Sequence, residues 1–417
     1  MTVKTDNNRK LSQLLTVGIM LILMLATIFV SGEILIRYLT RNDTNVIQVN
    51  GIAIPPLHPP LQQIRDSIEN YKTQINHAPF IYDATLGWNN QPNFNEDGII
   101  INSGAMRTRH EYELVPADDT LRIAIFGDSF TYSAEVPDDQ TFSHFLETFL
   151  QEKGIRAEVL NFGVPAYGAD QSYLRWLNDA VNYHPDIVIL NYSTRMSSRS
   201  LNIFRVISSP ETILPFSKPR FYLENGSLQL VNSPTIPLDE VVDTIQNFEN
   251  HPLREYEYYY DDRYVDTWWR QSKFLSYVTE SIRNTIVNYV GDSSPELIDV
   301  NKAIIQAFAD DASNNNAIFV LGHMAARKNL SQTEDTIQYL QILTQFADQY
   351  PFIDGAKVLE QVEKANGWLP DGHYNGIGNQ IVGDYFASQI IDCLDDTTCL
   401  PARFADNPVF RITPADS

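Results

Sequence analysis

Short apolar runs, each with an amphipathic stretch before or after it, recur along the chain. Four of them are predicted to be strands, at residues 121–127 (LRIAIFG), 157–163 (AEVLNFG), 185–192 (PDIVILNY) and 316–322 (NAIFVLG). Val, Ile, Leu and Phe are nearly continuous in these runs, which is typical of parallel strands buried on both faces. The pattern therefore predicts an open α/β domain with helices covering a parallel sheet.

The segments between these predicted strands show the periodicity of amphipathic helices. Helices are expected in the stretches DDQTFSHFLETFLQEKG, Asp170 to Asn182, NKAIIQAFADDAS and IGNQIVGDYFASQIID. The last of these follows the loop LPDGHYN and closes the domain, which we place at residues 84–395.

Residues 194–296 interrupt the strand–helix alternation and are treated as an insertion. Seven Tyr or Trp residues lie between Tyr256 and Trp269. Either these rings pack the insertion onto the sheet, or they form a lid or a sugar-stacking wall, since aromatic rings commonly line pockets.

The N-terminal region contains one long uncharged apolar run, LSQLLTVGIMLILMLATIFVSG. At about 1.5 Å per residue it is long enough to cross a hydrocarbon core of about 30 Å. Lys4, Arg9 and Lys10 precede it, so the positive-inside rule predicts a cytoplasmic tail at residues 1–10 and an anchor at residues 11–36.

A cleaved signal peptide is the alternative reading of this run. The run is long, no clear A-x-A site follows it, and EILIRYL continues the helical pattern, which favours a retained anchor. We therefore expect a single-pass membrane protein with an extracytoplasmic domain. Residues 37–83 would be a proline-rich connector with a helix near residues 60–72, and residues 396–417 a C-terminal tail.

Charge and cysteine content narrow the function classes. The formal net charge is -22, so nucleic acid is not an expected partner, because phosphate binding needs a basic face. Cys393 and Cys399 have no zinc-site spacing and no second Cys/His pair, so we expect no metal site. They could close a small disulfide loop outside the cytoplasm or remain two thiols.

Ser129 is the leading candidate nucleophile. It follows the strand at residues 121–127 within FGDSFTY, where a strand passes into a helix, and ligands of open α/β sheets bind beyond the carboxyl ends of strands. Gly127 allows a tight turn, and backbone N–H groups at the helix start point to the same place. The structural alternative is an Asp or Ser helix cap.

A nucleophilic serine needs a base and a group that orients the base. Of the eight histidines, His323 in FVLGHMA and His373 in LPDGHYNGIGNQ follow strand or loop signals at the required edge of the sheet. Asp371 precedes His373 by two positions, so an Asp–X–His loop would direct both side chains into one cleft. The sequence therefore predicts a Ser129–His373–Asp371 site.

The segments FGDSFTY, NFGVPAYGADQ and PDGHYNGIG resemble the first, second and last conserved sequence blocks of the SGNH (GDSL-type) hydrolases. The segment LGW…PN…INSGAMRT resembles the membrane-anchored bacterial group within that family. The resemblance covers residues 84–192 and 365–393. It implies a flavodoxin-like three-layer α/β fold, Ser129 as nucleophile, His373 as base and Asp371 as the orienting carboxylate. It also implies an oxyanion hole formed by the N–H groups of Ser129 and Gly163.

The third block departs from this family's pattern. An asparagine usually follows the third strand as a further oxyanion donor, whereas this chain reads LNYSTRMSS, with Arg195 and Met196 at the corresponding place. Asn191, Ser193 or Arg195 could substitute. Losing one donor typically costs about 3 kcal/mol of transition-state stabilisation.

The leading hypothesis is a serine esterase, without metal or organic cofactor, that removes small O-acyl groups, in the first place acetyl, from an extracytoplasmic carbohydrate. Two alternatives stay open. The same residues would make an O-acyltransferase if a sugar hydroxyl replaced water, and the altered third block would suit a non-catalytic module that binds polysaccharide or assists assembly. A purely structural reading assigns the serine to capping and the histidine to the core.

Overall fold

The computed structural model describes residues 3–40, 47–49, 52–264, 267–290, 294–327, 338–360, 362 and 366–395. The chain forms two compact units. The smaller one comprises Met1–Gln63 and Tyr260–Asn288, and the larger one comprises Ile64–Tyr259 and Tyr289–Ser417. Cys399 and the predicted tail lie outside the described residues.

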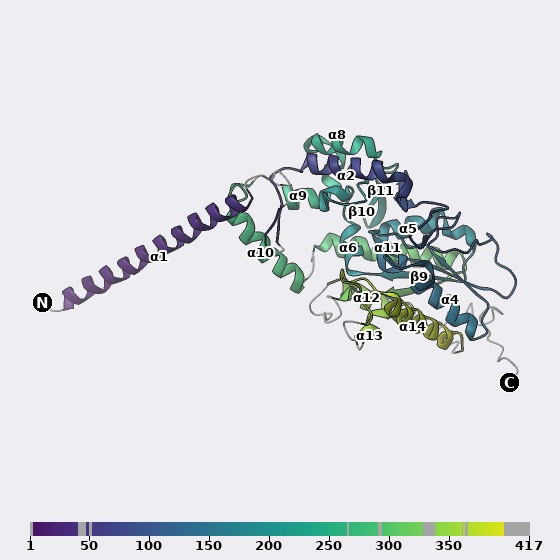
Figure 1. The fold of residues 1–417 in the computed structure, drawn as a ribbon. Coiled ribbons are helices and arrows are strands. Elements are labelled where there is room, and N and C mark those ends of the chain that lie inside the picture. Colours follow the sequence, from purple (N-terminus) through teal and green to yellow (C-terminus); the bar gives the residue numbers. More distant parts are fainter. Residues whose placement is uncertain are drawn as a thin grey trace. The chain divides into compact units, whose positions relative to one another are not determined.

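A five-stranded parallel sheet forms the centre of the larger unit (Figure 1). Its strands are β7 (Leu121–Phe126), β8 (Ala157–Asn161), β9 (Ile187–Tyr192), β12 (Ile318–His323) and β13 (Phe352–Asp354). They lie in the order β13–β12–β9–β7–β8, which is 2-1-3-4-5 when read from the opposite edge and counted along the chain. This is the flavodoxin-like order, so the predicted fold class is confirmed. The four predicted strands are present, and β13 is an additional short edge strand.

Helices cover both faces of the sheet because alternate strand residues point to opposite sides. Ile123 and Ile125 of β7 join the core formed with α4 (Phe142–Glu152) and α14 (Gly376–Asp395). Ala124 and Phe126 join the core formed with α5, α11 and α12 on the other face. The bounds of these three helices are Ala169–Asn178, Pro295–Asn314 and Gln338–Ala347. The two cores give the three layers of the fold.

The chain between β9 and α11 starts in the larger unit with short helices and a hairpin. These elements are α6 (Thr194–Arg199), α7 (Arg205–Ser208), β10 (Arg220–Glu224), β11 (Ser227–Val231) and α8 (Val241–Gln246). The next helix, α9 (Tyr258–Tyr264), begins in the larger unit and ends in the smaller one. Glu257 joins the start and the end of this segment, because its buried carboxylate accepts the N–H groups of Ile203 and Phe204 at 2.6 and 2.8 Å.

Smaller elements precede the sheet or connect its strands. They are the hairpins β1 (Ile47–Val49) with β2 (Ile52–Ile54), β3 (Phe80–Asp83) with β4 (Gly87–Asn90) and β5 (Asn95–Glu96) with β6 (Ile99–Ile100), and the helices α2 (Leu61–Gln74), α3 (Ser129–Tyr132) and α13 (Gly355–Leu359). The helix expected near residues 60–72 is α2.

The smaller unit contains α1 (Val3–Leu39) and most of α10 (Lys273–Val290). Glu33 of α1 accepts hydrogen bonds from the Ser272 hydroxyl at 2.7 Å and the Phe274 N–H at 2.9 Å, and the rings of Phe29 and Phe274 are 6.0 Å apart. Because a helix start leaves unpaired N–H groups, the Glu33 carboxylate stabilises the beginning of α10. Part of the predicted 194–296 insertion thus belongs to the unit that contains the N-terminal helix.

Within α1, the segment Ser12–Leu39 contains an 18-residue window with a mean hydropathy of 2.6, none of which is buried by protein. Their length and composition fit a membrane span, and a signal sequence has the same properties.

Candidate active site

Ser129 begins the one-turn helix α3, two residues after the last residue of β7. Asp128 is the residue that caps this helix, because its carboxylate accepts the Phe130 N–H at 3.1 Å. The interpretation of Ser129 as a helix cap is therefore wrong. Its hydroxyl is instead within hydrogen-bonding distance of a histidine.

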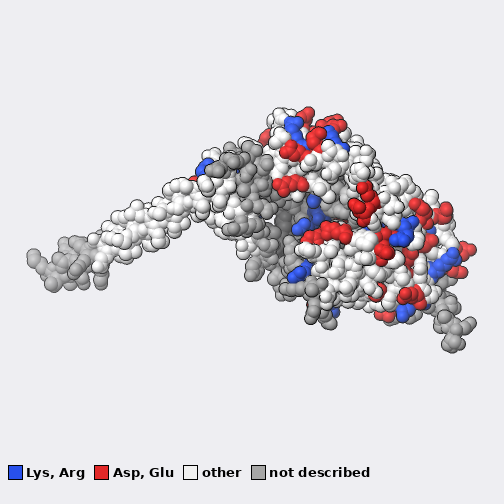
Figure 2. Space-filling model, viewed as in Figure 1, with Lys and Arg blue, Asp and Glu red and all other residues white. Residues whose placement is uncertain are grey.

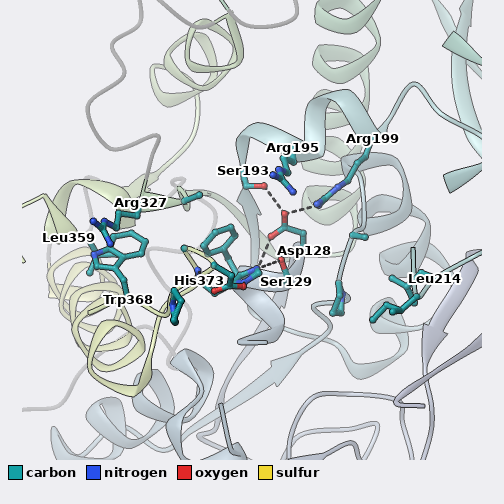
Figure 3. Close-up of a pocket in the computed structure, with 18 of the residues that line it drawn as sticks. Asp128, Ser129, Ser193, Arg195, Arg199, Leu214, Arg327, Leu359, Trp368 and His373 are labelled. Carbon is teal, nitrogen blue, oxygen red and sulfur yellow. Dashed lines mark hydrogen bonds and ion pairs between the residues drawn. The ribbon is translucent and has the colours of Figure 1, made fainter. Parts of the chain in front are cut away.

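The loop before α14 carries that histidine. His373 Nε2 lies 2.8 Å from Ser129 Oγ, and Nδ1 of the same ring is hydrogen-bonded to Asp371 Oδ2 (Figure 3). The other Asp371 oxygen accepts the His373 N–H at 3.1 Å. Gly372 between them has φ +95°, a left-handed conformation that glycine adopts without strain, and this turn brings the two side chains together. The three residues predicted from the sequence thus meet in one chain of contacts.

A second carboxylate lies beside this chain. Glu135 Oε1 is 4.0 Å from His373 Nδ1, and the Glu135 and Asp371 side chains are hydrogen-bonded to each other. Burial and the neighbouring Asp371 charge raise the pKa of Glu135. Burial acts in the same direction on Asp371, but hydrogen bonds from His373 and Glu135 lower its pKa below the ordinary value. Glu135 therefore holds a proton more readily than Asp371, which remains the carboxylate partner of the ring.

Glu135, Asp371 and His373 also form the one group of potential metal ligands found among the described residues, with ligand atoms within 4.8 Å of one another. Both ring nitrogens of His373 are engaged, one by Asp371 and the other by Ser129. A cation there would have only the two carboxylates as free ligands.

Ser129 and His373 open into a cavity of about 880 Å³. Its walls come from the segments that follow all five strands of the sheet. The lining residues lie at positions 128–130, 165–166, 193–214, 326–327, 359–360, 362, 368 and 370–373. This is the edge where open α/β sheets bind ligands. The wall after β9 is the first part of the predicted insertion, so that segment contributes to the site.

None of the seven aromatic residues between Tyr256 and Trp269 lines this cavity. Tyr259, Tyr260 and Tyr264 are buried, whereas Trp268 is 79% exposed. The aromatic residues at the cavity are Phe130 and Trp368.

Of the predicted oxyanion donors Ser129, Gly163 and Asn191, only Ser129 lines the cavity. In the described part of the chain no acceptor binds the Ser129 N–H, which lies at the cavity. The Gly163 N–H donates to Asn161 Oδ1 at 2.9 Å, and Gly163 does not line the cavity. Asn191 is buried against Gly322 of β12 and is also absent from the lining.

The two remaining alternatives for the third block do line the cavity. Ser193 donates its hydroxyl hydrogen to Asp128 Oδ2 at 2.8 Å, so its hydroxyl is already committed. Arg195 is exposed at the cavity. Of Asn191, Ser193 and Arg195, only Arg195 combines the position and a free donor group.

His323, the other candidate base, lies elsewhere on the same edge of the sheet. Its Nδ1 is 2.8 Å from Asp354 Oδ1, and Asp354 also caps α13. Burial opposes ionisation of Asp354, but the hydrogen bond from His323 lowers the pKa of this carboxyl. The pair connects the ends of β12 and β13 and does not line the cavity.

Sequence reasoning missed Glu135, Arg199, Arg205 and Trp368. Three arginines occur within the eleven residues 195–205, immediately after a predicted strand end. Their position directly after a predicted strand end could have identified these arginines as candidate site residues. Glu135 and Trp368 had no comparable signal, because their place depends on how loops fold.

The sheet order is flavodoxin-like, and Ser129, His373 and Asp371 form one chain of contacts beyond the carboxyl ends of its strands. No protein-family model matches the chain, and no curated protein matches it.

Several solved structures are similar over about two thirds of the chain. A lipolytic protein of the G-D-S-L family from Desulfitobacterium hafniense has 14% identity and a TM-score of 0.34, covering 64% of this chain and 99% of its own. The acetylxylan esterase Axe2 from Geobacillus stearothermophilus has 12% identity and a TM-score of 0.36, covering 64% and 93%. A two-domain esterase active on acetylated mannans has 10% identity and a TM-score of 0.36, covering 67% and 50%. These likenesses are too distant to indicate a substrate.

Proposed function

We propose that the protein is a serine esterase that removes small O-acyl groups, in the first place acetyl, from an extracytoplasmic carbohydrate. The observation that carries the proposal is the continuous contact from Ser129 through His373 to Asp371 at the mouth of a cavity. A serine hydroxyl becomes an effective nucleophile when a base accepts its proton and a carboxylate orients that base.

In the proposed reaction, Ser129 Oγ attacks the ester carbonyl while His373 Nε2 takes the hydroxyl proton. Asp371 keeps the ring in the tautomer that leaves Nε2 free to accept, and stabilises the protonated ring. The ring then gives the proton to the departing alkoxide oxygen, which leaves an acyl-serine. Water, deprotonated by His373, attacks this acyl group, releases the carboxylic acid and restores Ser129.

The negative oxygen of the tetrahedral intermediates needs donors. Ser129 would supply its unpaired N–H, and Arg195 would supply a charged side chain from the third-block position. Gly163 would take part only by exchanging its bond to Asn161 for one to the substrate.

The carbohydrate substrate and the extracytoplasmic site rest on further arguments. The cavity volume suits a sugar unit rather than a bare acetyl group, and Trp368 offers an aromatic lining. The apolar helix α1, with Lys4, Arg9 and Lys10 on its N-terminal side, supports an anchored protein whose larger unit lies outside the cytoplasm.

The first test is hydrolysis of 4-nitrophenyl acetate by the full chain in detergent. We expect Ser129→Ala to reduce kcat/KM by about a thousandfold or more, because no other side chain replaces the nucleophile. Ser103→Ala, which removes an exposed hydroxyl bound to Glu111, is the matched control and should retain full activity. Equal turnover by wild type and Ser129→Ala, with both folded, would exclude Ser129 as the nucleophile.

A further inference from the structure

Three arginines lie on the segment after β9 and line the cavity that holds Ser129 and His373. Arg195 and Arg199 belong to α6, and Arg205 begins α7. The chain as a whole has a net charge of -22, and Asp and Glu side chains are spread over the described face of the molecule in Figure 2. The presence of three arginines around one cavity of such an acidic protein therefore requires a physical explanation.

Arg199 has an internal partner. Its guanidinium donates to Asp128 Oδ2 at 2.8 Å, and the dashed lines of Figure 3 show Asp128 between Ser193 and Arg199. Asp128 is therefore already committed to Arg199 and does not neutralise the other two arginines.

Arg205 lacks such a partner among the described residues. Its side chain makes no hydrogen bond or ion pair there, and its Nε atom is buried and unsatisfied. Burial, together with the neighbouring Arg199 and Arg195 charges, lowers the pKa of Arg205 to about 9. A partly buried cation with no counter-charge is costly to keep, since desolvation of the charge is not fully repaid.

Arg195 is exposed at the cavity and likewise makes no side-chain ion pair within the described chain. The remaining acidic residues that line the cavity are Asp371, which binds His373, and Glu360, which is exposed. Among the described residues, neither Asp371 nor Glu360 forms an ion pair with Arg195 or Arg205.

We propose that Arg205 binds an oxyanion carried by the substrate, with the neighbouring Arg195 adding positive charge to the cavity, so that the enzyme deacylates acidic molecules in preference to neutral ones. The guanidinium group matches the planar geometry of carboxylate and the oxygens of phosphate or sulfate, and binds them with charge-assisted hydrogen bonds. The bound anion would supply the counter-charge that Arg205 lacks. This proposal rests on the proposed esterase function and names its substrate class.

The test compares acidic and neutral acetylated polymers. We would measure kcat/KM of the full chain in detergent on acetylated polygalacturonate and on acetylated xylan. Wild type should prefer the acidic polymer, and Arg205→Gln should lower the acidic-to-neutral ratio about tenfold, as expected for losing one charge-assisted hydrogen bond. Arg156→Gln removes an exposed arginine that does not line the cavity, and should leave the ratio unchanged.

A binding measurement separates this proposal from the esterase function. Ser129→Ala protein, which cannot turn over, would be titrated calorimetrically with oligogalacturonate, inorganic phosphate and sulfate, with and without Arg205→Gln. Saturable binding that Arg205→Gln weakens about tenfold supports the proposal, and the preferred probe identifies a carboxylate or a phosphate or sulfate as the anion. Absence of binding by all three probes, or equal affinity in both proteins, would overturn it. Failure of the esterase alone would appear as binding without Ser129-dependent turnover.

Discussion

The chemistry of single residues at the site depends on how three ionisable groups share protons. Asp371 and Glu135 are hydrogen-bonded, and their pKa values move in opposite directions. One carboxyl therefore remains the partner of His373 while the other titrates closer to neutrality. Glu135 also has a left-handed backbone, with φ +69°, which places its carboxylate beside the ring.

We expect kcat/KM of Glu135→Gln to depend less steeply on pH on the acid side than kcat/KM of wild type. The substitution removes a carboxyl group whose pKa is raised by burial and by Asp371, and whose ionisation changes the charge beside His373. The glutamine amide can still donate a hydrogen bond to Asp371. The measurement is the pH dependence of 4-nitrophenyl acetate hydrolysis, with the exposed Glu152→Gln as control. Identical acid sides in wild type and Glu135→Gln would show that Glu135 does not influence the reaction.

At the scale of elements, the position of α3 decides whether Ser129 reaches the cavity. This helix has one turn, so it is fixed by what packs against it. Asn161, at the end of β8, donates to the Thr131 carbonyl at 2.8 Å and accepts the Gly163 N–H. A Cβ atom on Gly163 would lie 2.6 Å from the Tyr132 nitrogen. The glycine predicted as an oxyanion donor thus permits close packing of the loop after β8 against α3.

Gly163→Ala should destabilise the protein by about 1–3 kcal/mol, the usual cost of overpacking, and should reduce esterase activity by moving α3. Thermal unfolding and kcat/KM on 4-nitrophenyl acetate would be measured together. Gly154→Ala is the matched control for added volume, because a Cβ atom there meets no neighbour within 4 Å, although its φ of +81° adds some backbone strain. Wild-type stability and activity in Gly163→Ala would show that the contact is not required.

The elements that the sequence predicted are those whose signal is local. β7, β8, β9 and β12 are buried on both faces, so their apolar runs are continuous and easily recognised. β13 has three residues and pairs on one side only, so it gives no such run.

The same distinction applies to the site. Ser129, His373 and Asp371 lie in short motifs at strand or helix boundaries. Arg205 and Glu135, by contrast, become neighbours of these residues only through the course of α7 and of the loop after α3. Predicting Gly163 as a donor required knowing the direction of one N–H bond, which Asn161 determines.

At the scale of the whole molecule, retention or removal of α1 decides whether the mature protein is anchored or secreted. The helix is apolar over Ser12–Leu39, and Glu33 near its C-terminal end binds the first N–H groups of α10. Removal of α1 as a signal sequence would leave Phe274 and the start of α10 without these partners. The internal contacts of the smaller unit thus favour a retained helix.

The full-length protein, produced in a bacterial host, should remain in the membrane pellet after washing with high salt and with alkaline carbonate, and should dissolve in detergent. This is the behaviour of a transmembrane helix, whose apolar length makes insertion effectively irreversible. Intact-mass measurement of the purified protein checks the same point, and should give the full 47.5 kDa. A soluble product shortened by about 30–40 residues would instead identify a cleaved signal peptide.

The hydrogen bonds of Asp128 limit how the segment between β9 and α11 can be exchanged for another sequence. One of the Asp128 oxygens caps the helix that begins with Ser129, and the other accepts hydrogen bonds from Ser193 and Arg199 at the start of the segment after β9. The helix that carries Ser129 and the cavity wall after β9 are therefore not independent modules. A loop transplanted between β9 and α11 to change specificity would have to bring its own donors for the Asp128 carboxylate, or the serine would lose its alignment together with the old substrate preference.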